Sequence, residues 1–140
     1  MAETHSLFGA WRLVSLRFEF AGTTDRADMF GTDPMGSLIL TPDFHMSTVI
    51  TSRGRGAAAS ASGQATLFGS MMAYSGRFRL EGHDQFITRV EVAWHPGWVG
   101  TDQARTYALD GGRLSIVTAE TLHPMFGDRS GRGVLIWVRA

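Results

Sequence analysis

The sequence predicts an all-β protein, an eight-stranded up-and-down antiparallel β-barrel that forms one domain over residues 1–140. Three observations predict this fold class. Apolar and polar residues alternate along residues 86–94 and 101–109, which is the period of a strand with one dry face. Most other apolar segments also have the length and period of strands, and the connections between them are local. A closed barrel buries the dry faces of such strands and leaves no open edge.

The first half of the chain supplies three of the strands. The first is predicted over residues 10–20, and a loop rich in Gly, Thr and Asp follows over residues 21–35. Strands over residues 36–41 and 45–51 then flank a tight turn, because Pro42 sets the first dihedral angle of that turn.

One short helix is predicted between the third and fourth strands. Residues 52–63 are of low complexity and are expected to be mobile, and the helix follows over residues 64–73. Its apolar side carries Leu67, Phe68, Met71 and Met72. This side forms either an adaptable lid, since Met fills irregular shapes, or a plug inside the barrel.

The second half of the chain supplies five strands and decides which end of the barrel is open. The strands are predicted at residues 74–81, 85–94, 101–109, 113–119 and 133–139. Tight turns and longer connections alternate along the whole chain, so each set lies at its own end of an up-and-down barrel. We therefore expect one shut end, and a pocket that opens at the end with the long loops.

The composition narrows the classes of partner and chemistry. Thirteen basic and thirteen acidic side chains give a formal net charge of zero, which argues against nucleic acid or an anionic membrane as the partner. No apolar run approaches the roughly 18 residues of a membrane-spanning helix, and the first nine residues lack signal-peptide features, so we expect a cytoplasmic protein. Cysteine and lysine are absent, which removes disulfides, thiolate chemistry and lysine Schiff bases. We expect no cofactor.

Short motifs in a fixed order resemble the lipocalin-like domain family of small bacterial and fungal proteins. The segment FGAWRLVS, residues 8–15, is similar to the family's G-x-W-x-L-V-S opening. The likeness continues through PMGSL at 34–38, TPD at 41–43, AYSG at 73–76, PGWVGT at 96–101 and WVR at 137–139. The resemblance implies an eight-stranded calycin-type barrel and little about chemistry. Family members often carry a histidine where this chain has Thr88 and Arg89.

Two arginines are interpreted from their strand positions. Trp11 begins the first strand and Arg139 ends the last, and the resemblance to lipocalins implies a structural cation–π contact between them at the shut end. Arg105 shares a strand face with Tyr107 and Leu109, which points it into the barrel. Because a buried guanidinium needs acceptors, Arg105 either anchors a carboxylate, enolate or carbonyl group of a ligand or belongs to an internal hydrogen-bond network.

Further candidate ligand-binding residues are predicted around the pocket. The hydroxyl groups on the predicted inner faces either orient a ligand or are satisfied within the core; they belong to Tyr74, Tyr107, Thr88, Thr48 and Ser15. The apolar wall is predicted to consist of Trp94, Trp98, Phe78, Met46, Leu109 and Met71.

Two histidines precede proline in long connections at the open end. His95 lies in the corner at residues 95–100 and His123 in the loop at residues 120–132. They serve as acid and base, as metal ligands, or as rim residues without a special task. No H-x-H or H-E-x-x-H spacing supports a metal, so no metal site is predicted.

Three functional hypotheses follow. The first is a protein that binds a small, largely apolar metabolite in the barrel cavity, with no nucleic-acid or membrane partner and with a homodimer left open. The second is a cofactor-free cyclase or isomerase of secondary metabolism that acts on a polyketide- or terpenoid-like intermediate. Its catalytic candidates are Arg105, Tyr74, Tyr107 and His95. The third is a structural or stress protein with a filled barrel and no ligand.

Overall fold

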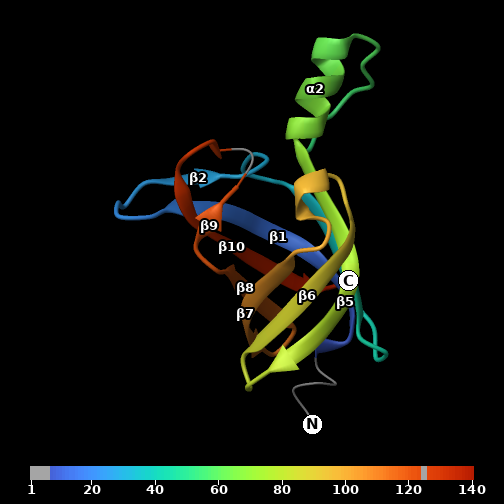
Figure 1. The fold of residues 1–140 in the computed structure, drawn as a ribbon, viewed down its shortest axis with the longest axis vertical. Coiled ribbons are helices and arrows are strands. Elements are labelled where there is room, and N and C mark those ends of the chain that lie inside the picture. The colour runs from blue at the N-terminus through green and yellow to red at the C-terminus, as the bar shows by residue number, and fades with distance from the viewer. Residues whose placement is uncertain (1–6, 124–125) are drawn as a thin grey trace.

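The alternation in the sequence becomes alternating burial along the strands of a closed antiparallel barrel (Figure 1). The computed structural model describes residues 7–123 and 126–140. The strands are β1 Gly9–Phe20, β2 Arg26–Asp28, β3 Met35–Leu40, β4 His45–Thr51, β5 Met71–Glu81, β6 Gln85–Ala93, β7 Asp102–Asp110, β8 Arg113–Thr118, β9 Thr121–Leu122 and β10 Ser130–Arg139. Eight of them follow one another in sequence order and β10 pairs with β1, which confirms the predicted barrel. The short strands β2 and β9, in segments predicted as loops, pair with β1 and β10.

The strand registers place the tight turns together at one end of the barrel. The start of β1 pairs with the ends of β3 and β10, and the amide of Ala140 donates a hydrogen bond to the carbonyl of Ala10 at 3.0 Å. The turns β3–β4, β5–β6 and β7–β8 therefore lie at this end. The longer connections, including helix α2 (Ala61–Gly69) and the 3₁₀ turn η1 (Pro96–Trp98), lie at the other end (Figure 1).

The shut end is filled by Trp11, whose side chain is 1% exposed. Its indole Nε1 donates a hydrogen bond to the carbonyl of Leu7 at 3.0 Å. The guanidinium carbon of Arg139 lies 3.9 Å from the centre of the Trp11 ring, and Nη1 of Arg139 donates to the carbonyl of Phe8 at 2.7 Å. These contacts confirm the predicted pairing of Arg139 with Trp11, which ties the last strand to the first.

A β-bulge in β1 corrects one predicted inner face. The register of β1 with β10 shifts between Leu13 and Ser15. Because an extra residue reverses the direction of every side chain beyond it, Leu16 and Phe18 are buried in the core and Ser15 is only half-buried. The prediction that the Ser15 hydroxyl faces the pocket is therefore wrong.

A second bulge lies where β5 pairs with β6. Gly76 pairs with Val90 and Ser75 pairs with Val92, so one residue of β6 is left over. Val92, which the alternation placed inside, is consequently 65% exposed. A Cβ atom on Gly76 would collide with the backbone carbonyl oxygen of Arg89, so this crossing requires glycine.

The helix lies earlier in the chain than predicted and does not enter the barrel. Ser60 caps α2 by accepting a hydrogen bond from the amide of Gly63 at 3.1 Å. Met71 and Met72 belong to β5, where they pair with β4, so the predicted apolar helix side is wrong. No residue of α2 is buried, and Figure 1 shows the helix extending away from the barrel. The prediction of a plug is therefore also wrong.

Within the described part of the chain, no helix is long and apolar enough to cross a membrane. Six of the nine N-terminal residues on which the prediction of a cytoplasmic protein rests lie outside the described residues, which start at Leu7.

Candidate functional site

The barrel interior contains a narrow cavity lined by residues of all eight barrel strands. Its volume is about 50 Å³, counted as the space open to the centre of a water molecule, so it has room for a few waters. Most of its wall is apolar and includes the flexible side chains of Met29, Met46 and Met72. The polar side chains in the wall are Thr48, Tyr74, Gln103, Arg105, Thr118, Thr121 and His123.

Arg105 is the one arginine among the described residues of this wall. The regular alternation of β7 points it inward, opposite Phe86 of β6 and Thr118 of β8, and it is 7% exposed. Its Nη1 donates to the neighbouring carbonyl of Ala104 at 3.0 Å, and its Nη2 donates to the hydroxyl oxygen of Tyr74 at 3.1 Å. A guanidinium has five N–H donors, so these two bonds leave donors available for a ligand.

The charge of Arg105 has no carboxylate partner among the described residues. The ion pairs of the described chain lie on the outside of the barrel, and none includes Arg105. None of the described residues that line the cavity is Asp or Glu. A buried guanidinium without an opposite charge is costly, and this cavity therefore favours an anion.

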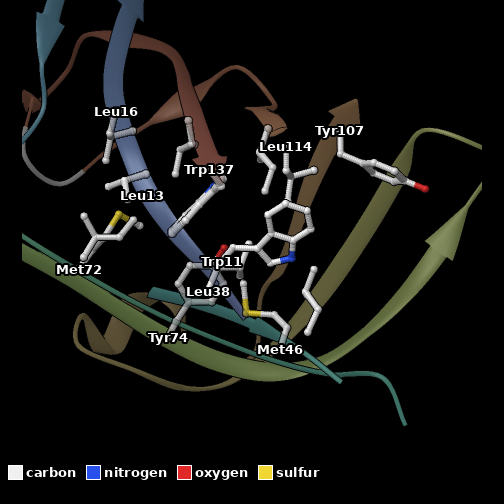
Figure 2. Packing of buried hydrophobic residues seen from close by; sticks show 14 of the residues in the cluster. Trp11, Leu13, Leu16, Leu38, Met46, Met72, Tyr74, Tyr107, Leu114 and Trp137 are labelled. Carbon is white, nitrogen blue, oxygen red and sulfur yellow. The ribbon is translucent and has the colours of Figure 1, made fainter. Parts of the chain in front are cut away.

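Tyr74 reaches the same cavity from β5 on the other side of the interior. Its ring lies 5.9 Å from the guanidinium carbon of Arg105 and packs edge-on against Trp98 at 5.1 Å between ring centres. Figure 2 shows the Tyr74 ring pointing into the interior, where Met46 and the indoles of Trp11 and Trp137 also lie. The Tyr74 hydroxyl accepts the bond from Arg105, and its own proton has no acceptor among the described residues.

His123 is buried in an aromatic cage at the loop end of the cavity. Its ring stacks on Trp94 at 6.1 Å and contacts Trp98 edge-on at 6.1 Å, with Phe18 and Phe126 also close. Burial, followed by the positive charges of Arg105 and His95, lowers the pKa of His123 to about 4. The imidazole is therefore neutral at pH 7 and can accept a hydrogen bond, but it is a weaker base than an ordinary histidine.

The two predicted histidines have different positions. His123 lines the cavity, whereas His95 is half-buried and caps η1 by accepting a hydrogen bond from the amide of Gly97 at 3.0 Å. Their rings are separated by Trp94, which contacts both. Among the described residues, no three His, Asp or Glu side chains form a cluster that could hold a metal ion.

Five of the predicted binding residues lie in the cavity wall: Arg105, Tyr74, Trp98, Met46 and Thr48. The others lie elsewhere in the fold. Tyr107 is buried below Arg105, and Figure 2 shows its hydroxyl pointing away from the indoles. Residues buried or half-buried outside the cavity wall are Thr88, Phe78, Trp94, Leu109 and Met71. Thr48 lines the cavity, and its hydroxyl donates to the carbonyl of Ser37 at 2.9 Å.

Sequence reasoning missed four polar contributors, which are Gln103, Thr118, Thr121 and the indole N–H of Trp137. Gln103 shares the inner face of β7 with Arg105, which the alternation showed without indicating a role. Trp137 also lines the cavity, is fully buried, and its Nε1 has no hydrogen-bond partner among the described residues. The missing partner of that indole N–H has no signature in the sequence.

Comparison of the sequence with known protein families agrees with the closed eight-stranded barrel. A family model described as a lipocalin-like domain matches residues 8–140. The chain belongs to the lipocalin-like domain family. No curated protein matches the sequence. A lipocalin-like barrel is suited to hold a small molecule in its interior, so the cavity is the candidate ligand-binding site of this family member.

Proposed function

We propose that this lipocalin-like protein binds a small, largely apolar metabolite in the barrel cavity. The observation that carries the proposal is a mostly apolar cavity into which a few polar groups, above all Arg105 and Tyr74, converge. A ligand larger than a few atoms must displace side chains. Met29, Met46 and Met72 are suited to this, because methionine changes rotamer at little cost.

The test is a titration with the neutral apolar fluorophore N-phenyl-1-naphthylamine, whose emission rises in a dry site. We expect saturable binding that Leu135→Phe weakens at least tenfold, because Leu135 lines the cavity and the larger ring fills it. The matched control is Val134→Phe, one residue away on the other face of β10. Equal binding by both variants, or no binding by the native chain, contradicts the proposal.

A second candidate function is a cofactor-free cyclase or isomerase that acts on a polyketide- or terpenoid-like intermediate. The observation in its favour is that a guanidinium, a phenol and a neutral imidazole line one cavity. Arg105 and Tyr74 would polarise a carbonyl oxygen, and His123, rather than His95, would accept a proton.

A ketone probe tests this chemistry without knowledge of the substrate. Deuterium incorporation at the α-carbon of 2-octanone in D₂O, followed by NMR, should be faster with the native protein than with His123→Phe. Rates equal to that of buffer would leave only the binding function.

A further inference from the structure

The polar groups of the cavity are unevenly divided between donors and acceptors. Arg105 has N–H groups that no described residue accepts, and so does the buried indole of Trp137. The Tyr74 hydroxyl accepts from Arg105 and leaves its proton to be donated elsewhere. These groups need an acceptor, so a ligand that supplies hydrogen-bond acceptors satisfies them, whereas a ligand with only donors does not.

The cavity is positively charged as well as rich in hydrogen-bond donors. Arg105 is buried there, the described residues of the wall include no carboxylate, and the described acidic side chains in ion pairs are on the outer surface. Burial is the main cause of the low pKa of His123, and the positive charge of Arg105 lowers it further because it opposes protonation of the imidazole. Because no described side chain in the cavity neutralises this positive charge, an anionic ligand would do so.

We propose that the ligand is an apolar carboxylic acid, bound as its carboxylate by Arg105 and Tyr74 with the hydrocarbon part along the methionine-lined wall. This inference rests on the proposed function and names its ligand class. The guanidinium presents N–H groups in a planar fork that matches the two oxygens of a carboxylate. Tyr74 donates its hydroxyl proton to one of those oxygens while it keeps accepting from Nη2 of Arg105.

A matched series of head groups tests the inference on the native chain. Hexanoate, hexan-1-ol and hexylamine each contain six carbon atoms in an unbranched chain and differ in charge at pH 7. Each is titrated into isotopically labelled protein, and the indole N–H resonances of Trp98 and Trp137 report on the cavity they line. We expect hexanoate to bind at least tenfold more tightly than hexan-1-ol, and hexylammonium to bind most weakly.

Variants then assign the preference to the two residues. Arg105→Met should reduce the ratio of the two dissociation constants, hexan-1-ol over hexanoate, to about one while hexan-1-ol still binds. Tyr74→Phe, which keeps the ring, should reduce the ratio severalfold. Arg77→Met removes an exposed arginine of β5 and should leave the ratio unchanged.

The outcomes separate the two proposals. If hexan-1-ol binds as tightly as hexanoate to the native chain, the carboxylate inference is overturned and the apolar binding function stands. If Arg105→Met keeps the full preference for hexanoate, the inference is overturned as well. If none of the three compounds shifts the cavity resonances and the fluorophore also fails to bind, both proposals are overturned. Where Arg105→Met does not fold, the comparison of head groups on the native chain and on Tyr74→Phe decides.

Discussion

Nη2 of Arg105 lies 3.1 Å from the hydroxyl of Tyr74, and this hydrogen bond crosses the barrel interior from β7 to β5. The pair joins a charge that has no described counter-ion to a phenol whose proton is still available. Both side chains line the same small cavity. A protein that needed only a stable core would satisfy these positions with apolar residues, so the pair links the stability of the barrel to its proposed function.

Removing the charge should stabilise the fold. We expect Arg105→Met to raise the free energy of unfolding by roughly 1–3 kcal/mol, because it replaces a buried guanidinium that has no described counter-ion by an apolar side chain. Urea denaturation measures the change, and Arg77→Met, on the outer face, should stay within about 0.5 kcal/mol of the native chain. A clear loss of stability in Arg105→Met would instead favour the internal hydrogen-bond network.

Burial of His123 should make stability depend on pH. Its folded-state pKa of about 4 lies below the ordinary value of 6.5, so the unfolded chain binds more protons between these values and stability falls as the pH falls through this window. At pH 5 this costs about 2 kcal/mol relative to pH 7 or above. Urea denaturation at pH 5 and pH 7 measures the loss. His123→Phe should remove most of the difference, and an undiminished difference would assign it to other groups.

The contact that ties the last strand to the first should contribute to stability. We expect Arg139→Met to lower the free energy of unfolding by roughly 1–2 kcal/mol, because it removes the cation–π contact with Trp11 and the hydrogen bond to the Phe8 carbonyl. Arg113→Met, an exposed position at the same end of the barrel, serves as the control. Equal stability of the two variants would show that this contact adds nothing.

The bulge between β5 and β6 should tolerate no side chain at Gly76. Gly76→Ala places a methyl group against the backbone carbonyl of Arg89, and we expect a loss of at least roughly 3 kcal/mol or failure to fold. Gly56→Ala, where no atom lies within 4 Å of the added methyl group, should change stability by less than about 0.5 kcal/mol. Thermal unfolding of the two variants provides the comparison.

Much of the barrel could be predicted because the period of two is visible wherever a strand has one dry face. The segment His45–Thr51 was predicted with the bounds that the structure has, and β7 kept the predicted inward direction of Arg105. The bulges could not be predicted from the period, because each depends on pairing with a distant strand. They account for the errors at Ser15 and Val92. The helix begins and ends earlier than predicted, because Ser60 caps its start and Met71 already belongs to a strand, where it pairs with Thr51.

The candidate site was predictable in part for the same reason. Arg105 and Tyr74 follow from regular alternation, and their mutual hydrogen bond follows from the closure of the barrel. Among the described residues, Arg105 has no counter-ion and the indole N–H of Trp137 has no hydrogen-bond acceptor. Both facts depend on which side chains meet in the interior, and the alternation along a strand does not show this. His123 and His95 were predicted at the same end of the barrel with their roles left open, and the structure separates them, since His123 lies in the aromatic cage and His95 caps η1.

The hydrogen bond from the amide of Ala140 to the carbonyl of Ala10 shows that the last residue lies next to the first barrel strand. A circular permutant that links residue 140 to residue 7 and opens in the exposed segment 53–59 preserves every strand pairing of the barrel. The new termini of this permutant lie at the loop end of the barrel. A reporter domain fused to them would be placed close to the site of the proposed ligand.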